Sequence, residues 1–148
     1  MHRRLIATIV AASLTLIAVA GVAIAAGKPK RGTYIDTKLQ VYITTTKDVS
    51  AVKSFQAPCL GKSSTGELVQ SGSMVVSRSM KIKPGGAFSY SGKAKIYSGS
   101  APKPAIETVK VKASYTGGKY KGTASFPAKY ECETTAFSAK YYGVNPQG

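Results

Sequence analysis

Lysine is the residue type whose spacing in this sequence could do chemistry. Four pairs of lysines after residue 80 are each two residues apart, and alternate residues of a β-strand lie on the same face of a sheet. If their strands are neighbours, the pairs form a continuous basic surface. Such a surface could bind a wall phosphate polymer such as teichoic acid, anionic lipid head groups or nucleic acid. The eight candidate residues are Lys81, Lys83, Lys93, Lys95, Lys110, Lys112, Lys119 and Lys121.

The overall charge leaves two explanations for these lysines. Residues 26–148 contain 19 basic and 6 acidic side chains, a net charge of +13, which is more than solubility requires. The solvated face of an antiparallel sheet must nevertheless carry polar side chains, and lysine also discourages edge-to-edge aggregation. Only Arg31 and Arg78 follow the hydrophobic segment. This scarcity disfavours nucleic acid, because arginine makes most bidentate contacts to phosphates and bases.

Catalytic side chains are scarce. The only histidine, His2, precedes the hydrophobic segment, so the rest of the chain lacks the commonest general base and metal ligand. Ser50 and Lys53 match the S-x-x-K motif of penicillin-binding proteins, but its Lys-Thr-Gly and Ser-x-Asn partner motifs are absent. Glu131 and Glu133 could form an acid/base pair or a weak Ca²⁺ site, although pairing with nearby lysines explains them more simply. We predict no enzymatic activity, no metal site and no cofactor.

The elements that would position the lysines are β-strands, and the clearest lie in residues 106–127. Gly117-Gly118 joins two alternating runs, and this dipeptide favours a two-residue hairpin turn. The resulting register places apolar residues on one face and keeps lysines from facing each other on the other face. The predicted apolar pairs are Tyr115–Tyr120, Ala113–Gly122, Val111–Ala124 and Val109–Phe126, and the polar pairs are Lys112–Thr123, Lys110–Ser125 and Ser114–Lys121.

The remainder of the chain also favours strands. Turn signals recur every 8–12 residues and no helical period follows residue 26, which predicts about seven to nine strands in an all-β fold, either an antiparallel sandwich or a small barrel. The further strands are expected in residues 33–35, 39–44, 49–57 (closed by Pro58-Cys59-Leu60), 67–79 (one or two short strands), 80–83, 87–97 (with a bulge or bend at Gly92) and 134–141.

The N-terminus has the pattern of an export signal. A short basic region precedes an uncharged segment from Leu5 to Ala26, and Ala23-Ile24-Ala25 fits the small-x-small cleavage rule. We expect a signal-peptide helix over residues 1–25, with an uncleaved membrane anchor facing outside as the alternative, because 22 uncharged residues could span a bilayer. The expected mature parts are a basic, disordered linker (26–31), a β domain (32–142) and a flexible tail (143–148).

The two cysteines, Cys59 and Cys132, indicate a disulfide if the domain lies outside the cytoplasm. Two free thiols are the alternative. A closed zinc site is excluded, because two cysteines without a histidine cannot supply four ligands.

Short motifs give the chain a resemblance. The chain resembles a loose group of small exported β domains of unknown function that are common in high-GC Gram-positive bacteria. Many of these have a tryptophan in the last strand, where this chain has Phe137. The resemblance implies export, a β fold and one disulfide, and it implies no activity. The motifs are Gly32-Thr33-Tyr34, Phe55 with Pro58-Cys59, Gly85-Gly86-Ala87-Phe88-Ser89, Tyr120-Lys121-Gly122-Thr123, and Cys132 followed by Phe137-Ser138-Ala139-Lys140.

These features together predict a non-enzymatic, exported, basic β domain that associates electrostatically with anionic cell-envelope polymers or lipids. Contact with the membrane through the N-terminus is expected only if that segment is not cleaved. The alternative is a secreted protein-interaction or inhibitor-like module with a protein partner, presented by the loop at 61–66 or the loop at 98–104.

Overall fold

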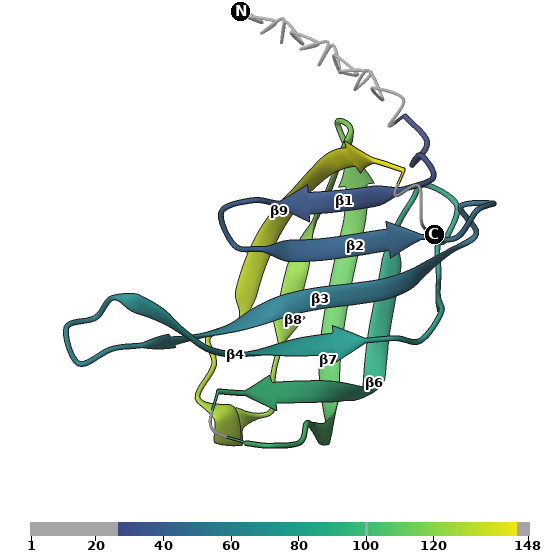
Figure 1. Ribbon diagram of the computed structural model, residues 1–148. Coiled ribbons are helices and arrows are strands. Elements are labelled where there is room, and N and C mark those ends of the chain that lie inside the picture. The colour runs from purple at the N-terminus through teal and green to yellow at the C-terminus, as the bar shows by residue number, and fades with distance from the viewer. Residues whose placement is uncertain (1–26, 100, 145–148) are drawn as a thin grey trace, which may run out of the picture.

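The computed structural model describes residues 27–99 and 101–144, so the expected signal helix and the end of the tail lie outside the described residues (Figure 1). The regular secondary structure of the described chain is almost entirely β-strand. Its elements are β1 (Thr33–Asp36), β2 (Val41–Thr45), β3 (Ala51–Lys62), β4 (Leu68–Val76), β5 (Met80–Lys81), β6 (Phe88–Ser98), β7 (Ala105–Thr116), β8 (Lys119–Ser125), the short 3-10 helix η1 (Ala128–Tyr130) and β9 (Thr135–Gly143).

The strands form one antiparallel sheet that closes on itself. From β1 to β9 each strand pairs with the next along the ring, except that β4 pairs directly with β6 while the short β5 pairs with the start of β3. Pairing of β1 with both β2 and β9 completes the ring. In Figure 1, β1–β4 run across the front of the molecule, β7–β9 run up and down behind them, and β6 bends from the upright direction to end horizontally below β4. Of the two architectures that the sequence allows, the small barrel is therefore the observed one.

Apolar and aromatic side chains fill the interior of the barrel. Tyr34 and Tyr120 meet edge to face, with ring centroids 4.8 Å apart, and Phe88 contacts Tyr120 in the same way at 5.4 Å. Burial raises the pKa of both tyrosines well above the usual range. The hydroxyl of Tyr34 has backbone partners, whereas the buried hydroxyl of Tyr120 has none among the described residues.

The hairpin at Gly117-Gly118 is confirmed in its register. β7 and β8 pair Tyr115 with Tyr120 and Lys112 with Thr123, and the other predicted pairs from Lys110–Ser125 to Ser114–Lys121 are present as well. Only Val109–Phe126 is not a ladder pair, because β8 ends at Ser125. Alternation of apolar and polar residues decided this register, since a slip of one residue would turn every apolar side chain outward.

The expected end of the third strand at Pro58-Cys59-Leu60 is wrong, because β3 continues to Lys62. The Pro58 carbonyl accepts a hydrogen bond from the hydroxyl of Thr135 at 3.4 Å, on the side facing away from β4. The N–H and C=O of one strand residue point to the same side, so the missing N–H of Pro58 also faces away from β4. Pairing with β2 has already ended at Gln56, so the proline interrupts no ladder there.

Two further expectations concern glycines within strands, and only the second differs from the structure. Residues 67–79 contain one strand, β4, which is one of the two expected outcomes; its pairing with β3 shifts at the Cys59–Leu60 step, so the glycine and serines there do not break the ladder. Gly92 makes no bulge, because its pairing opposite Val109 lies in an unbroken register. The glycine instead leaves room for the ring of Tyr90, whose hydroxyl would lie 2.9 Å from an added Cβ.

The segment expected to be a disordered linker is held against one end of the barrel. The N–H of Lys30 donates to the Tyr34 hydroxyl at 2.6 Å, and this hydroxyl donates to the Lys30 carbonyl at 3.0 Å. The Tyr141 hydroxyl donates to the carbonyl of Arg31 at 3.1 Å. A tyrosine whose ring is buried still requires a partner for its hydroxyl. The backbone of the segment supplies that partner here.

Gly122 offers a test of this packing. An added Cβ would collide with the backbone carbonyl of Lys112 and lie 2.8 Å from the Cβ of Ala113. We expect Gly122→Ala to lower the free energy of unfolding by about 1–3 kcal/mol, the usual cost of overpacking, when measured by urea denaturation. The exposed change Thr116→Ser on β7 should stay within about 0.5 kcal/mol. Equal effects of the two changes would contradict the described packing of β7 on β8.

Candidate anion-binding surface

The outward faces of β6–β9 gather most of the lysines that the sequence singles out. These four strands carry seven lysines and one glutamate, Glu107. We call this surface the lysine face. Lys140 on β9 was not predicted as part of it, because the sequence does not show that β9 lies beside β8. The lysines of this face are Lys93, Lys95, Lys110, Lys112, Lys119, Lys121 and Lys140.

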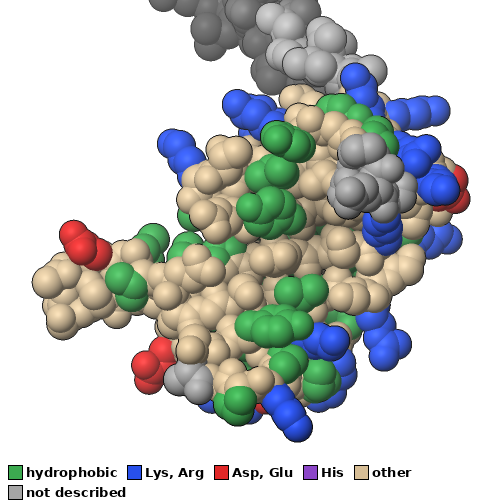
Figure 2. Space-filling view, viewed as in Figure 1, with side chains coloured by type: hydrophobic (Ala, Val, Ile, Leu, Met, Phe, Trp, Pro, Cys, Tyr) green, Lys and Arg blue, Asp and Glu red, His purple; other side chains and the backbone are tan. Residues whose placement is uncertain are grey.

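The opposite side of the barrel is nearly uncharged. Strands β1–β4 carry only Lys53, Lys62 and Asp36 as charged residues. Figure 2 views this side and shows mainly polar uncharged and apolar side chains, with lysine and arginine gathered toward the edges. Solubility alone would not require such a division, since charge spread over both faces would serve it equally well.

The sheet register brings several lysines close to one another. Within the hairpin each lysine lies opposite a serine or a threonine; the partner of Lys119, beside the turn, is Thr116. Across to β9, however, Lys119 lies directly opposite Lys140, and like charges in that position are destabilising. Lys121 is two residues from Thr123, the partner of Lys112, so the two lysines are diagonal neighbours about 7–8 Å apart. Two ammonium groups 7–8 Å apart would repel by about 0.5 kcal/mol in water.

Three lysines border one shallow depression of about 480 Å³. They are Lys83 from the turn before β6, Lys112 from β7 and Lys121 from β8, so three of the four predicted pairs contribute one member each. The fourth pair, Lys93 and Lys95, lies with Arg78 at a smaller depression of about 180 Å³. Lys81 does not line the larger depression. One member of each of three predicted pairs therefore lies at the same depression, while the fourth pair lies elsewhere.

The carboxylates lie outside the larger depression and are partly neutralised. Lys129 forms an ion pair with Glu107, and its hydrogen bond lowers the pKa of Glu107. Lys62 pairs with Glu133 at 3.4 Å, which supports the simple explanation of that residue. The described residues contain no group of three His, Cys, Asp or Glu side chains that could hold a metal ion. No salt bridge among these residues involves Lys83, Lys112 or Lys121.

A second basic depression lies at the end of the barrel near residue 31, and the sequence analysis did not predict it. Its volume is about 240 Å³, and Arg31, Lys47 and Lys53 line it together with four threonines. One of these, Thr46, donates to Asp48 at 2.6 Å. This hydrogen bond and those from Ser50 lower the pKa of Asp48 to about 2. The hydroxyls here are therefore largely occupied by bonds within the protein.

A hairpin projects from the barrel on the side opposite the second basic depression. We call residues 59–71, which belong to β3, β4 and their turn, the arm (Figure 1). The pairing of β4 with β6 begins only at Gly72, directly after the arm. Leu68 and Val69 are 58% and 47% exposed. Gly99, near the start of the loop at 98–104, lies at the base of the arm, where its N–H donates to the Ser71 carbonyl at 3.3 Å.

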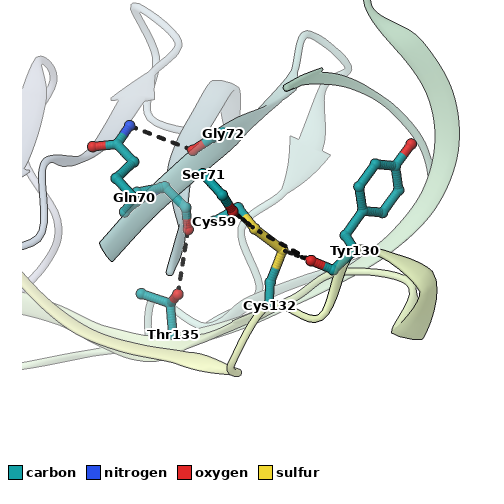
Figure 3. Close-up of a disulfide and its surroundings, with 8 residues drawn as sticks. Cys59, Gln70, Ser71, Gly72, Tyr130, Cys132 and Thr135 are labelled. Carbon is teal, nitrogen blue, oxygen red and sulfur yellow. Dashed lines mark hydrogen bonds between the residues drawn. A yellow bond between two sulfur atoms is a disulfide. The ribbon is translucent and has the colours of Figure 1, made fainter. Parts of the chain in front are cut away.

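The expected disulfide is present at the base of the arm, so the alternative of two free thiols is excluded. Cys59 on β3 joins Cys132 in the segment between η1 and β9, with 5.2 Å between their Cα atoms (Figure 3). The same segment is held to β3 by the N–H of Glu133, which donates to the Leu60 carbonyl at 2.8 Å. A disulfide is typical of proteins that function outside the cytoplasm.

Comparison with known proteins gives no information on the function of this chain. No family model, curated protein or solved structure matches this chain. Over residues 27–99 and 101–144 the structure also has no helix with the length and hydropathy of a membrane span. The chemistry of the lysine face and of the arm is therefore the basis for any functional conclusion.

Removal of the disulfide should destabilise the protein strongly. It closes a loop of 73 residues, for which the chain-entropy model gives about 4 kcal/mol. We expect the double change Cys59→Ala and Cys132→Ala to lower the free energy of unfolding by that order in urea denaturation. The wild-type protein with reductant should behave like the double variant. An unchanged midpoint in both experiments would contradict a structural role for the bond.

Proposed function

We propose that this protein is a non-enzymatic, exported β domain that binds anionic polymers or lipids of the cell envelope through its lysine face. The observation that carries the proposal is the gathering of seven lysines against one glutamate on β6–β9. A face of this kind attracts polyanions and raises their local concentration without fixed geometry. Lysine suits that role, because its ammonium group is a flexible point charge.

Export remains part of the proposal and has support from two sides. The disulfide between Cys59 and Cys132 favours an oxidising compartment. The signal pattern of residues 1–25 and the resemblance to small exported β domains favour the same location. In such a location, wall phosphate polymers and anionic lipid head groups are the polyanions that the lysine face would meet.

A protein partner is the second candidate function, and the arm favours it. The arm carries the turn at 61–66 away from the barrel, and Gly99, near the start of the loop at 98–104, is bonded to its base. Exposed Leu68 and Val69 would lose contact with water if a partner covered them. Binding of this kind would resist high salt, in contrast to binding by the lysine face.

The lysine face can be tested by removing charge at four positions. We expect Lys110, Lys112, Lys119 and Lys121 changed together to Gln to weaken binding to phosphatidylglycerol-rich vesicles at low salt by up to about a thousandfold, at about 1 kcal/mol per lysine near an anionic surface. Vesicle co-sedimentation and binding to soluble polyphosphate would measure the effect. Salt near 0.5 M should release the wild-type protein from both.

A matched control separates local from overall charge. Lys28, Lys38, Lys47 and Lys53 changed to Gln remove the same charge from outside β6–β9. This control should bind vesicles and polyphosphate much more tightly than the first variant. If the two variants lose equal affinity, the charge acts without a defined face. If the wild-type protein binds neither probe at low salt, the proposed function is wrong.

The arm can be tested independently. We expect Leu68→Ser with Val69→Thr to change the free energy of unfolding by no more than about 0.5 kcal/mol, because both side chains are exposed. The same variant should lose any protein that the wild type retains from culture medium in high salt. Ile106→Thr is the control, since Ile106 is 56% exposed but lies on β7. Retention of the same protein by both variants would remove the arm from consideration.

A further inference from the structure

We propose that the depression bordered by Lys83, Lys112 and Lys121 is a binding site for a single phosphate group, such as one phosphodiester unit of a polymer. This inference rests on the proposed function and narrows it, because it assigns a place and a ligand chemistry within the lysine face. The depression has a volume of about 480 Å³. That space exceeds what one phosphate group requires and leaves room for its ester substituents.

The three lysines come from separate segments and are brought together by the sheet. Lys112 and Lys121 are diagonal neighbours across β7 and β8, and their stems are long enough for both ammonium groups to reach one anion. Lys83 approaches from the turn that precedes β6, where its N–H donates to the carbonyl of Ala87 at 2.7 Å. An anion between them would offset a mutual repulsion that the protein leaves uncompensated.

Hydroxyl groups line the surface between the ammonium groups. Ser89 lies opposite Lys112 on β6, Thr123 lies opposite it on β8, and Ser114 lies opposite Lys121. No side-chain hydrogen bond among the described residues uses these hydroxyls. Each is therefore available to donate to a phosphate oxygen, in contrast to the second basic depression, where Thr45 and Thr46 already donate to groups of the protein.

The absence of carboxylates selects for an anion. None of the residues that line the depression is Asp or Glu. Glu107, the only acid on β6–β9, is five positions from Lys112 along β7 and is paired with Lys129. Small residues, Ala87 and Gly122, complete the lining and leave the depression open to a polymer that passes across it. Three ammonium groups acting as point charges, with neutral donors between them, can surround the oxygens of one phosphate group.

Amide chemical shifts of the full folded domain would locate the site. Inorganic phosphate, dimethyl phosphate and acetate are titrated separately into the protein at low salt. We expect both phosphate compounds to give saturable shifts confined to the amides of Ser89, Ser114, Gly122 and Thr123, while acetate gives weak shifts without saturation. Shifts of equal size spread over all of β6–β9 would overturn the site.

Two triple variants of equal charge separate this site from the rest of the lysine face. Changing Lys83, Lys112 and Lys121 to Gln should reduce phosphate affinity at least tenfold. Changing Lys93, Lys95 and Lys110 to Gln should leave it within about twofold, since none of these residues lines the depression. A pair of changes that keeps the charge, Ser89→Ala with Ser114→Ala, should weaken phosphate binding severalfold. Equal loss in the two lysine variants would overturn the proposal.

Soluble polyphosphate distinguishes failure of the site from failure of the proposed function. If the wild type binds polyphosphate and the two lysine variants weaken it equally, the lysine face acts as a whole and the single site is wrong. If the wild type binds no polyphosphate, both proposals are wrong. Binding of polyphosphate at least tenfold tighter than inorganic phosphate would identify a polymer as the source of the group, and equal affinities would identify free phosphate.

Discussion

Closure of the sheet between β1 and β9 is the interaction on which the rest of the structure depends. β1 has only four residues, yet it pairs with β2 on one side and with β9 on the other. Tyr34 in the middle of β1 is fully buried and contacts the rings of Tyr115, Tyr120 and Tyr141. Burial of the Tyr34 side chain thus stabilises the strand β1 that closes the barrel. Closure also decides that one face of every strand is interior, which leaves the lysines only the outside.

The sequence predicts the hairpin better than the closure, for a physical reason. In β7 and β8 the alternation of side chains and the Gly117-Gly118 turn act over neighbouring residues, so the register follows from local chemistry. The pairing of Ile35 with Lys140 joins short segments that are far apart in the chain, and no local sequence pattern indicates it. Lys140 was missed as part of the lysine face for this reason. The depression was missed because Lys83 reaches it from a turn.

Proline and glycine residues, which were expected to end strands, account for the remaining wrong predictions of the fold. Pro58 and Gly61 have the composition of a strand end, but both lie within β3. A proline stops a ladder only where its missing N–H would have had a partner, and whether one exists depends on neighbouring strands. The arm was therefore expected as a short loop rather than as a long hairpin. The disulfide was predictable, because a count of two cysteines leaves a single possible pair.

The two edges of the arm differ, and this difference limits how the arm could associate. On the β3 side, Pro58, which directly precedes the arm, offers no donor, and the segment that contains Cys132 and Glu133 is joined to Cys59 and bonded to the Leu60 carbonyl. On the β4 side, residues 68–71 lie beyond the ladder with β6. Stacking of strands into a fibril requires each member to pair on both edges. The β4 edge of the arm is therefore the more accessible of the two for an added strand, which favours a finite contact over growth into a fibril.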